Sequence, residues 1–221
     1  MDKETLLQTY IDIETTTYVR SEKTKRLGGF VDEIKKSDLS LSLEDSISIV
    51  QNLFEHNITI RHPFFLYVIY PALAKGVDNN DTSAIKLLIQ LFGYYGNFQN
   101  VTSDNKYTGW TLLKKGLQLA PFDKELLSIY EKQLEYYFDY TLHELPVGVL
   151  YESNGASIEE CDELLKELAD YEDVCKKLAI DRQELINDCK FYYNVYKAYL
   201  AVCKSYNGFA DYLDKHDLAG K

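Results

Sequence analysis

The sequence predicts an all-α fold, either a layered antiparallel helical bundle or an array of helical hairpins, with about nine helices. Apolar residues recur at spacings of three and four along most of the chain, which is the period of an α-helix. Proline and glycine are sparse, at 4 and 11 of 221 residues, so few positions interrupt a long helix. We expect one all-helical domain over residues 1–221, or alternatively a subdivision into 1–145 and 146–221.

The N-terminal segment is ambiguous. Leu6, Leu7 and Tyr10 fit one face of a helix, but β-branched and aromatic residues follow up to Val19. Residues 2–18 are therefore either a frayed helix or a short strand. Downstream, Ser42 is placed to cap a helix in a reciprocal pair with Asp45.

One basic cluster lies near the N-terminus, at Arg20, Lys23, Lys25 and Arg26. It fits either a phosphate site or a solvated helix face, and the acids that follow at residues 32 and 33 favour the solvated face.

Proline and aspartate mark the limits of the central helices. Pro63 suits the first turn of a helix, where its missing N–H is not needed. Pro71 should kink the same helix further along. Asp123 is placed to cap a long helix that continues to about Leu142.

The C-terminal third has the most regular pattern. One stripe at helical spacing contains Leu185, Cys189, Tyr192, Tyr196, Tyr199, Cys203 and Tyr206. A second stripe beside it contains Phe191, Val195, Ala198 and Val202. Such a wide apolar arc predicts a helix of about 25 residues that runs through the middle of the domain.

Acidic residues dominate the charge. The formal net charge is -11, and residues 152–173 contain nine acids against one base, Lys166. Ser157 and Glu160 predict a capping box at the start of a helix here. Its buried side is expected to contain Ile158, Cys161, Leu165 and Leu168. A negative surface of this kind repels nucleic acid and anionic membranes and attracts a basic protein.

No pattern of catalytic, cofactor-binding or metal-binding residues is present. Cys161, Cys175, Cys189 and Cys203 are spaced by fourteen residues, which on one helix means about 21 Å. We interpret them as buried structural thiols. His143–Glu144 lacks the second histidine that the zinc-peptidase motif requires four residues after the first.

The chain has no apolar run near the roughly 20 residues of a membrane span and no apolar stretch at its N-terminus typical of a secretory signal. We therefore expect a cytoplasmic location and free thiols.

Two predicted helices share a further pattern. Leu88, Leu91 and Tyr95 lie on the first, and Leu113, Gly116 and Pro121 belong to the second. This stretch, about residues 88–121, resembles a degenerate tetratricopeptide hairpin. The resemblance covers one hairpin, whose connecting loop is longer than the family's. It implies helical hairpins stacked into a layered array that presents a binding surface.

These features favour a binding protein over an enzyme, with a basic protein as its partner. Immunity proteins of bacterial toxin systems are similar in charge and size, and the similarity implies a neutralising inhibitor of a basic protein such as a nuclease toxin. The residues expected to bind the partner are Glu159, Glu160, Glu163, Glu167 and Asp170, with Tyr151 and Tyr171 as exposed anchors. The alternative interpretation of these acids is an ordinary solvated face.

Two other functions remain open. A repeat-like scaffold or regulator would hold a peptide in a helical groove around Tyr94, Tyr95 and Trp110. An enzyme would assemble its site from dispersed residues such as Tyr140, His143 and Glu144, in a pocket that gathers them.

Overall fold

A computed structural model describes residues 1–37, 39–94 and 106–219, without the side chains of Tyr94 and Glu152. Within these ranges the protein is helical, at 76% helix with no strand, which confirms the all-α prediction. The described residues contain ten α-helices when the continuous segment 62–78 is counted once, close to the nine expected. None of them has both the length and the apolar content needed to cross a membrane.

The chain divides into two compact units, unit 1 (Met1–Pro121) and unit 2 (Phe122–Lys221). Residue 145, the boundary of the alternative subdivision, falls within unit 2, between two of its helices. Whether the chain folds as one domain or two stays a prediction.

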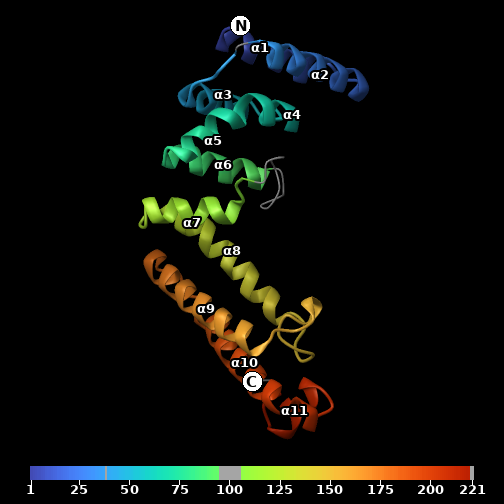
Figure 1. The fold of residues 1–221 in the computed structure, drawn as a ribbon, viewed down its shortest axis with the longest axis vertical. Coiled ribbons are helices and arrows are strands. Elements are labelled where there is room, and N and C mark those ends of the chain that lie inside the picture. The colour runs from blue at the N-terminus through green and yellow to red at the C-terminus, as the bar shows by residue number, and fades with distance from the viewer. Residues whose placement is uncertain (38, 95–105, 220–221) are drawn as a thin grey trace. The chain divides into compact units, whose positions relative to one another are not determined.

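Unit 1 is a succession of packed helices, in which the second helix contacts the segment 62–69 and the third contacts the segments 65–78 and 82–94 (Figure 1). Its helical segments are α1 (Lys3–Thr16), α2 (Arg20–Lys36), α3 (Leu43–Glu55), α4 (His62–Phe64), the π-helical turn η1 (Phe65–Ile69), α5 (Tyr70–Asp78), α6 (Thr82–Tyr94) and α7 (Gly109–Leu119).

The ambiguous N-terminal segment is the helix α1, capped by Asp2, whose carboxylate accepts from the Thr5 N–H at 2.8 Å. Tyr10 fixes this helix to the rest of unit 1. Its buried ring stacks on Phe64 at 3.8 Å between centroids. Its hydroxyl donates to the Thr59 carbonyl and accepts from the Arg61 N–H, both at 2.7 Å. These contacts join residues about 50 positions apart and stabilise residues 3–16 as a helix. The sequence of the segment alone does not contain them, so local propensity left helix and strand unresolved.

The sequence predicts a kink at Pro71, and the structure has a π-helical turn, η1, just before that residue. The Tyr70 N–H bonds to the Phe65 carbonyl, five residues earlier. Proline has no N–H to continue the ladder, so the hydrogen-bond pattern changes at this point.

Unit 2 packs three long helices against one another and ends in a short helix against the last of them. Its segments are α8 (Lys124–Leu142), the 3₁₀ turn η2 (Tyr151–Ser153), α9 (Ile158–Leu178), α10 (Gln183–Val202), the 3₁₀ turn η3 (Cys203–Ser205) and α11 (Phe209–Lys215). Asp123 caps α8 as predicted, accepting from the N–H groups of Glu125 and Leu126 at 3.1 Å.

The prediction that the last long helix runs through the middle of the domain is wrong. α10 has 20 residues, and Ile186, Cys189, Tyr193 and Tyr196 are its buried residues. The second apolar stripe lies on the opposite side, where Val202 is 44% exposed. The core is instead shared by one face each of α8, α9 and α10. An apolar stripe in the sequence does not show which side of a helix its neighbours cover.

A charged cluster joins the three long helices. Glu131 of α8 is 1% exposed. It accepts a hydrogen bond from Arg182, just before α10, at 2.9 Å, and Arg182 also pairs with Glu135 at 2.8 Å. The Tyr171 hydroxyl of α9 donates to Glu131 at 3.4 Å. A buried carboxylate is tolerated here because its oxygens have charged and hydroxyl partners.

Candidate protein-binding face

The acidic helix α9 begins with the predicted capping box. The Ser157 hydroxyl accepts from the Glu160 N–H at 3.1 Å, and the Glu160 carboxylate accepts from the Ser157 N–H at 2.7 Å. The bond from the Ser157 backbone holds the pKa of Glu160 below its usual range. Glu160 therefore has a structural partner, and its charge also stabilises the positive end of the helix dipole.

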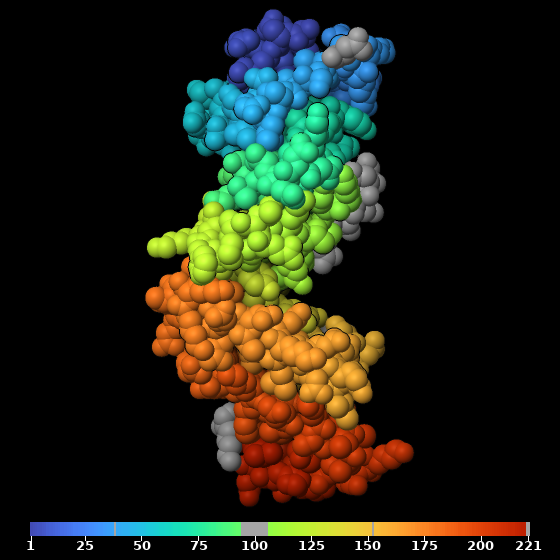
Figure 2. All heavy atoms as spheres, turned by 60° about the vertical axis from the view of Figure 1, so that its left-hand side comes forward, coloured from blue at the N-terminus to red at the C-terminus, as the bar shows by residue number. Residues whose placement is uncertain are grey.

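All five predicted acids of α9, residues 159, 160, 163, 167 and 170, are exposed. α9 lies at the surface of unit 2 (Figure 2, orange). The buried side of α9 differs in part from the prediction. Cys161 and Leu168 are buried as expected, but Leu164 takes the place of Leu165, and Ile158 is exposed.

Tyr171 is not an exposed anchor, and that prediction is wrong. It is fully buried, its ring lies 5.3 Å from Phe138, and burial raises the pKa of its hydroxyl. Its hydroxyl has an interior partner, Glu131, which nothing in the local sequence indicates. Tyr151 is 51% exposed, in η2.

On the flank of α9 that faces α10, the acids are paired with lysines. Lys197 of α10 contacts Asp162, and Lys190 contacts Glu172 at 2.7 Å. Lys176 also pairs with Glu172, at 3.1 Å. The bonds from Lys190 and Lys176 lower the pKa of Glu172.

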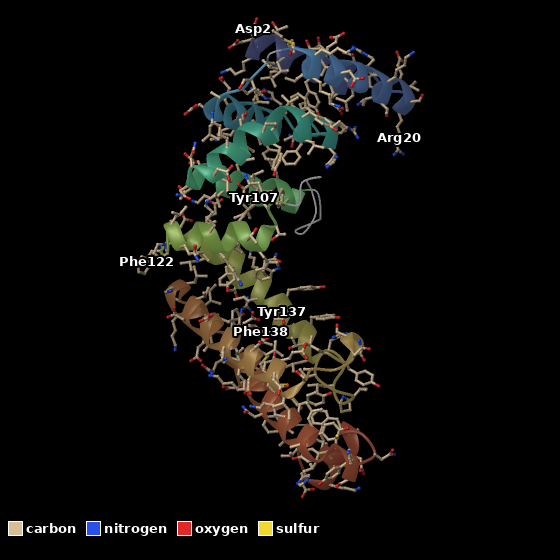
Figure 3. All side chains as sticks on the ribbon, in the orientation of Figure 1. Asp2, Arg20, Tyr107, Phe122, Tyr137 and Phe138 are labelled. Atoms are coloured by element: carbon tan, nitrogen blue, oxygen red, sulfur yellow. The ribbon has the colours of Figure 1, made fainter. Side chains whose placement is uncertain are left out.

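On the flank that faces α8, the acids have no such partners. Glu163, Glu167 and Asp170 have no ion pair among the residues that the structure describes. Tyr130 and Tyr137 of α8 lie half-buried near this flank. Burial raises the pKa of both hydroxyls, and neighbouring carboxylates, among them Glu167, raise them further. Tyr137 precedes the buried Phe138 on α8 (Figure 3). We call the following five residues the acidic–tyrosine face: Glu163, Glu167 and Asp170 of α9, with Tyr130 and Tyr137 of α8.

Two of the four basic residues near the N-terminus, Lys23 and Arg26, have partners within unit 1. Lys23 pairs with Glu14 at 3.4 Å, and Arg26 donates to the hydroxyls of Thr16 and Thr17.

The residues of the hypothetical dispersed enzyme site do meet. His143 Nε2 lies 3.2 Å from a Glu144 oxygen, and its ring stacks on Tyr140 at 4.6 Å. None of these three residues lines the clefts described next.

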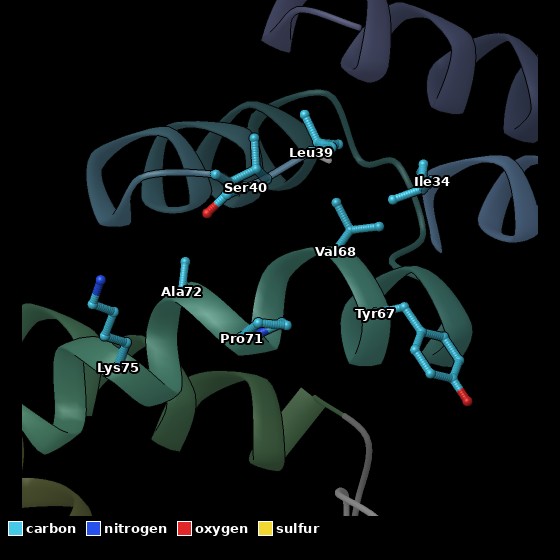
Figure 4. Close-up of a pocket in the computed structure, with 9 residues that line it drawn as sticks. Ile34, Leu39, Ser40, Tyr67, Val68, Pro71, Ala72 and Lys75 are labelled. Atoms are coloured by element: carbon cyan, nitrogen blue, oxygen red, sulfur yellow. The ribbon is translucent and has the colours of Figure 1, made fainter. Parts of the chain in front are cut away.

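A small cleft of about 150 Å³ lies in unit 1 between residues 39–41 and the η1–α5 segment (Figure 4). Ser40, Tyr67 and Lys75 are its polar side chains, beside Pro71 and several aliphatic residues. Two further clefts, both more open to solvent than the first, lie beside Arg182 and between α1 and α3. The first is smaller than a typical ligand pocket, and none contains a recognisable acid–base pair with a nucleophile.

Three of the four cysteines are buried, as predicted, but the prediction is wrong for Cys203, which is partly exposed at the end of the last long helix. Burial raises the pKa of the Cys161 and Cys189 thiols to about 11, which keeps them protonated and unreactive at neutral pH. No group of three or more potential ligands is placed to hold a metal ion in the part of the chain that the structure describes.

The predicted peptide groove falls mostly outside the described residues. Tyr95 and the side chain of Tyr94 are not described, and Trp110 is half-buried on α7. α6 and α7 do pack against each other, as a hairpin would.

Comparison with known proteins finds no matching family model, no matching curated protein and no matching solved structure. The tetratricopeptide resemblance therefore stays a prediction.

Proposed function

We propose that this chain is an acidic binding protein that neutralises a basic protein partner through the acidic–tyrosine face. The observation that supports it is the asymmetry of α9: acids toward α10 are matched by lysines, and acids toward α8 are not. If the acids served only solubility, no such division between the two flanks would be expected.

Uncompensated carboxylates along one flank repel one another, and a cationic partner removes that repulsion when it binds. They also steer a basic partner toward the face over distances up to the Debye length. A protein that occupies the cationic cleft of a nuclease with carboxylates excludes the phosphates of its substrate. A basic nuclease toxin is therefore the partner that we propose, and the role is that of an immunity protein.

The test uses a charge-reversal variant of the face, Glu163→Lys with Glu167→Lys and Asp170→Lys. The matched control, Asp139→Lys with Glu184→Lys and Asp188→Lys, changes the net charge equally at exposed positions of unit 2 outside the face. Both are compared with the unmodified protein for association with a panel of basic nuclease domains and for inhibition of nuclease activity. Circular dichroism checks that each variant is folded.

The face variant should associate at least about tenfold more slowly with the nuclease it inhibits, and the difference should shrink as salt rises. The control should lose much less. Equal losses in the two variants would show that net charge alone matters, and the face would then have no specific role.

A further inference from the structure

The unpaired acids of α9 are spaced like one stripe of a helix. Glu163, Glu167 and Asp170 are separated by four and three residues, so their backbone positions span about 10.5 Å along the axis. Beside them, Tyr130 and Tyr137 of α8 are seven residues apart, which is also about 10.5 Å. The face thus combines three carboxylates of α9 with two tyrosines of α8, the helix packed against it, and the two sets have the same axial span.

Tyrosine rings elsewhere in this chain already contact cations. The Lys35 ammonium lies 3.6 Å from the centre of the Tyr67 ring, and that of Lys215 lies 5.4 Å from the Tyr206 ring. No cation of the described residues lies over the Tyr137 ring. A ring beside carboxylates suits a guanidinium, which pairs with a carboxylate through its N–H groups while its plane stacks on the aromatic face.

We propose that the acidic–tyrosine face binds a helix of the partner whose arginines repeat at spacings of three and four residues. This inference rests on the proposed function of the same face and specifies what it recognises. A helix lying along α8 and α9 presents side chains with the same axial repeat as the carboxylates, so several pairs form in register. An extended segment repeats about every 6.6–6.8 Å on one side, so it matches the first two carboxylates but is about 3 Å out of register at the third.

The experiment uses two alanine-based helical peptides of equal length, each with four arginines. In the striped peptide the arginines occupy one face at three- and four-residue spacing, and in the dispersed peptide they are distributed around the helix. Binding of each to the full chain is measured by calorimetry at two salt concentrations. The variants are Tyr137→Leu, which removes the ring, and Tyr137→Phe, which keeps it. Tyr136→Leu is the control, because Tyr136 is 73% exposed and lies about 100° around α8 from Tyr137.

The striped peptide should bind at least about tenfold more tightly than the dispersed one, because its charges match the face in register. Tyr137→Leu should weaken that binding about fivefold, the effect of losing a cation–π contact, with Tyr137→Phe and Tyr136→Leu close to the unmodified protein.

Two other results are distinguishable. If both peptides bind equally and both are released by the triple charge reversal, the helix-specific inference is overturned and the proposed function stands. If neither peptide binds the unmodified protein at low salt, both are overturned. If Tyr137→Leu fails to fold, the ratio of the affinities of the unmodified protein for the striped and dispersed peptides still tests the inference. Binding of the striped peptide by Tyr137→Phe is then the second test.

Discussion

The two units of this protein reach the same kind of fold with very different charge. Unit 1 has 14 acidic and 13 basic residues, whereas unit 2 has 21 and 11, so nearly all of the net charge belongs to unit 2. Both are helical, and both bury aromatic side chains. Since unit 1 has a helical core without an acidic excess, the excess in unit 2 is not a requirement of the fold and calls for a separate explanation.

The units also differ in what fixes their helices together. In unit 1 a neutral hydroxyl, that of Tyr10, bridges two backbone groups near Arg61. In unit 2 a buried carboxylate, Glu131, is held by Arg182 and Tyr171. Breaking a charged contact in the interior costs more than breaking a neutral one, because the remaining charge has lost its solvent as well as its partner.

The largest expected effect is therefore in unit 2. Arg182→Ala leaves the Glu131 carboxylate buried without its cation and should destabilise unit 2 by about 3 kcal/mol. Amide hydrogen exchange in α8, α9 and α10 measures this directly. The chain's single tryptophan, Trp110, lies in unit 1, so its fluorescence follows unit 1 separately.

A control separates the buried from the exposed partner of Arg182. Glu135 is partly exposed, so Glu135→Gln should cost less than about 1 kcal/mol. Similar losses from Arg182→Ala and Glu135→Gln would contradict the view that burial of Glu131 sets the energy.

A smaller loss is expected in unit 1. Tyr10→Phe keeps the stacking on Phe64 but removes the hydroxyl from the Thr59 carbonyl and the Arg61 N–H. It should destabilise unit 1 by about 1–2 kcal/mol, the usual cost of an unmade buried hydrogen bond. Urea denaturation followed by Trp110 fluorescence measures it, with Tyr18→Phe as a control because Tyr18 is 92% exposed. A loss as large as that of Arg182→Ala would remove the distinction between the two contacts.

Local signals in the sequence predicted the secondary structure well. The caps at Ser42, Asp123 and Ser157 depend on residues within three positions of each other, and each is present. The reciprocal pair predicted at Ser42 differs, because the Asp45 carboxylate accepts from the Ser42 hydroxyl and not from its backbone N–H. The π-helical turn before Pro71 follows from one missing N–H group, although the sequence predicted a kink there. Such features involve neighbouring residues, so a single chain contains the information needed to predict them.

The predictions that were wrong or incomplete depend on contacts between residues that are distant in the sequence. Tyrosine is a residue type typical of interface anchors, but Tyr171 is buried against Glu131, which lies 40 residues away in the sequence. The lysines that divide the acids of α9 into paired and unpaired sets, Lys190 and Lys197, come from another helix. The sequence therefore predicted that α9 is acidic and exposed, but not which of its flanks lacks partners or that Tyr130 and Tyr137 lie beside it.

The smallest expected effect concerns salt and compares the units directly. Glu159, Glu163 and Glu167 follow one another at four-residue spacing on the exposed side of α9, and each like-charged pair destabilises the helix by a few tenths of a kcal/mol at low salt. Screening removes this repulsion, although it also weakens the pairs made by Lys190 and Lys197. With 21 acids against 11 bases, repulsion outweighs attraction in unit 2, so raising sodium chloride from about 20 to about 300 mM should raise its melting temperature by about 1–2 °C. The Trp110 transition of unit 1 should stay nearly constant, because its charges balance.

Glu163→Gln with Glu167→Gln removes the central repulsion and should reduce the salt response of unit 2. If the unmodified unit 2 shows no response, its carboxylates are already compensated in the free protein, and the acidic–tyrosine face loses the physical basis for attracting a basic helix.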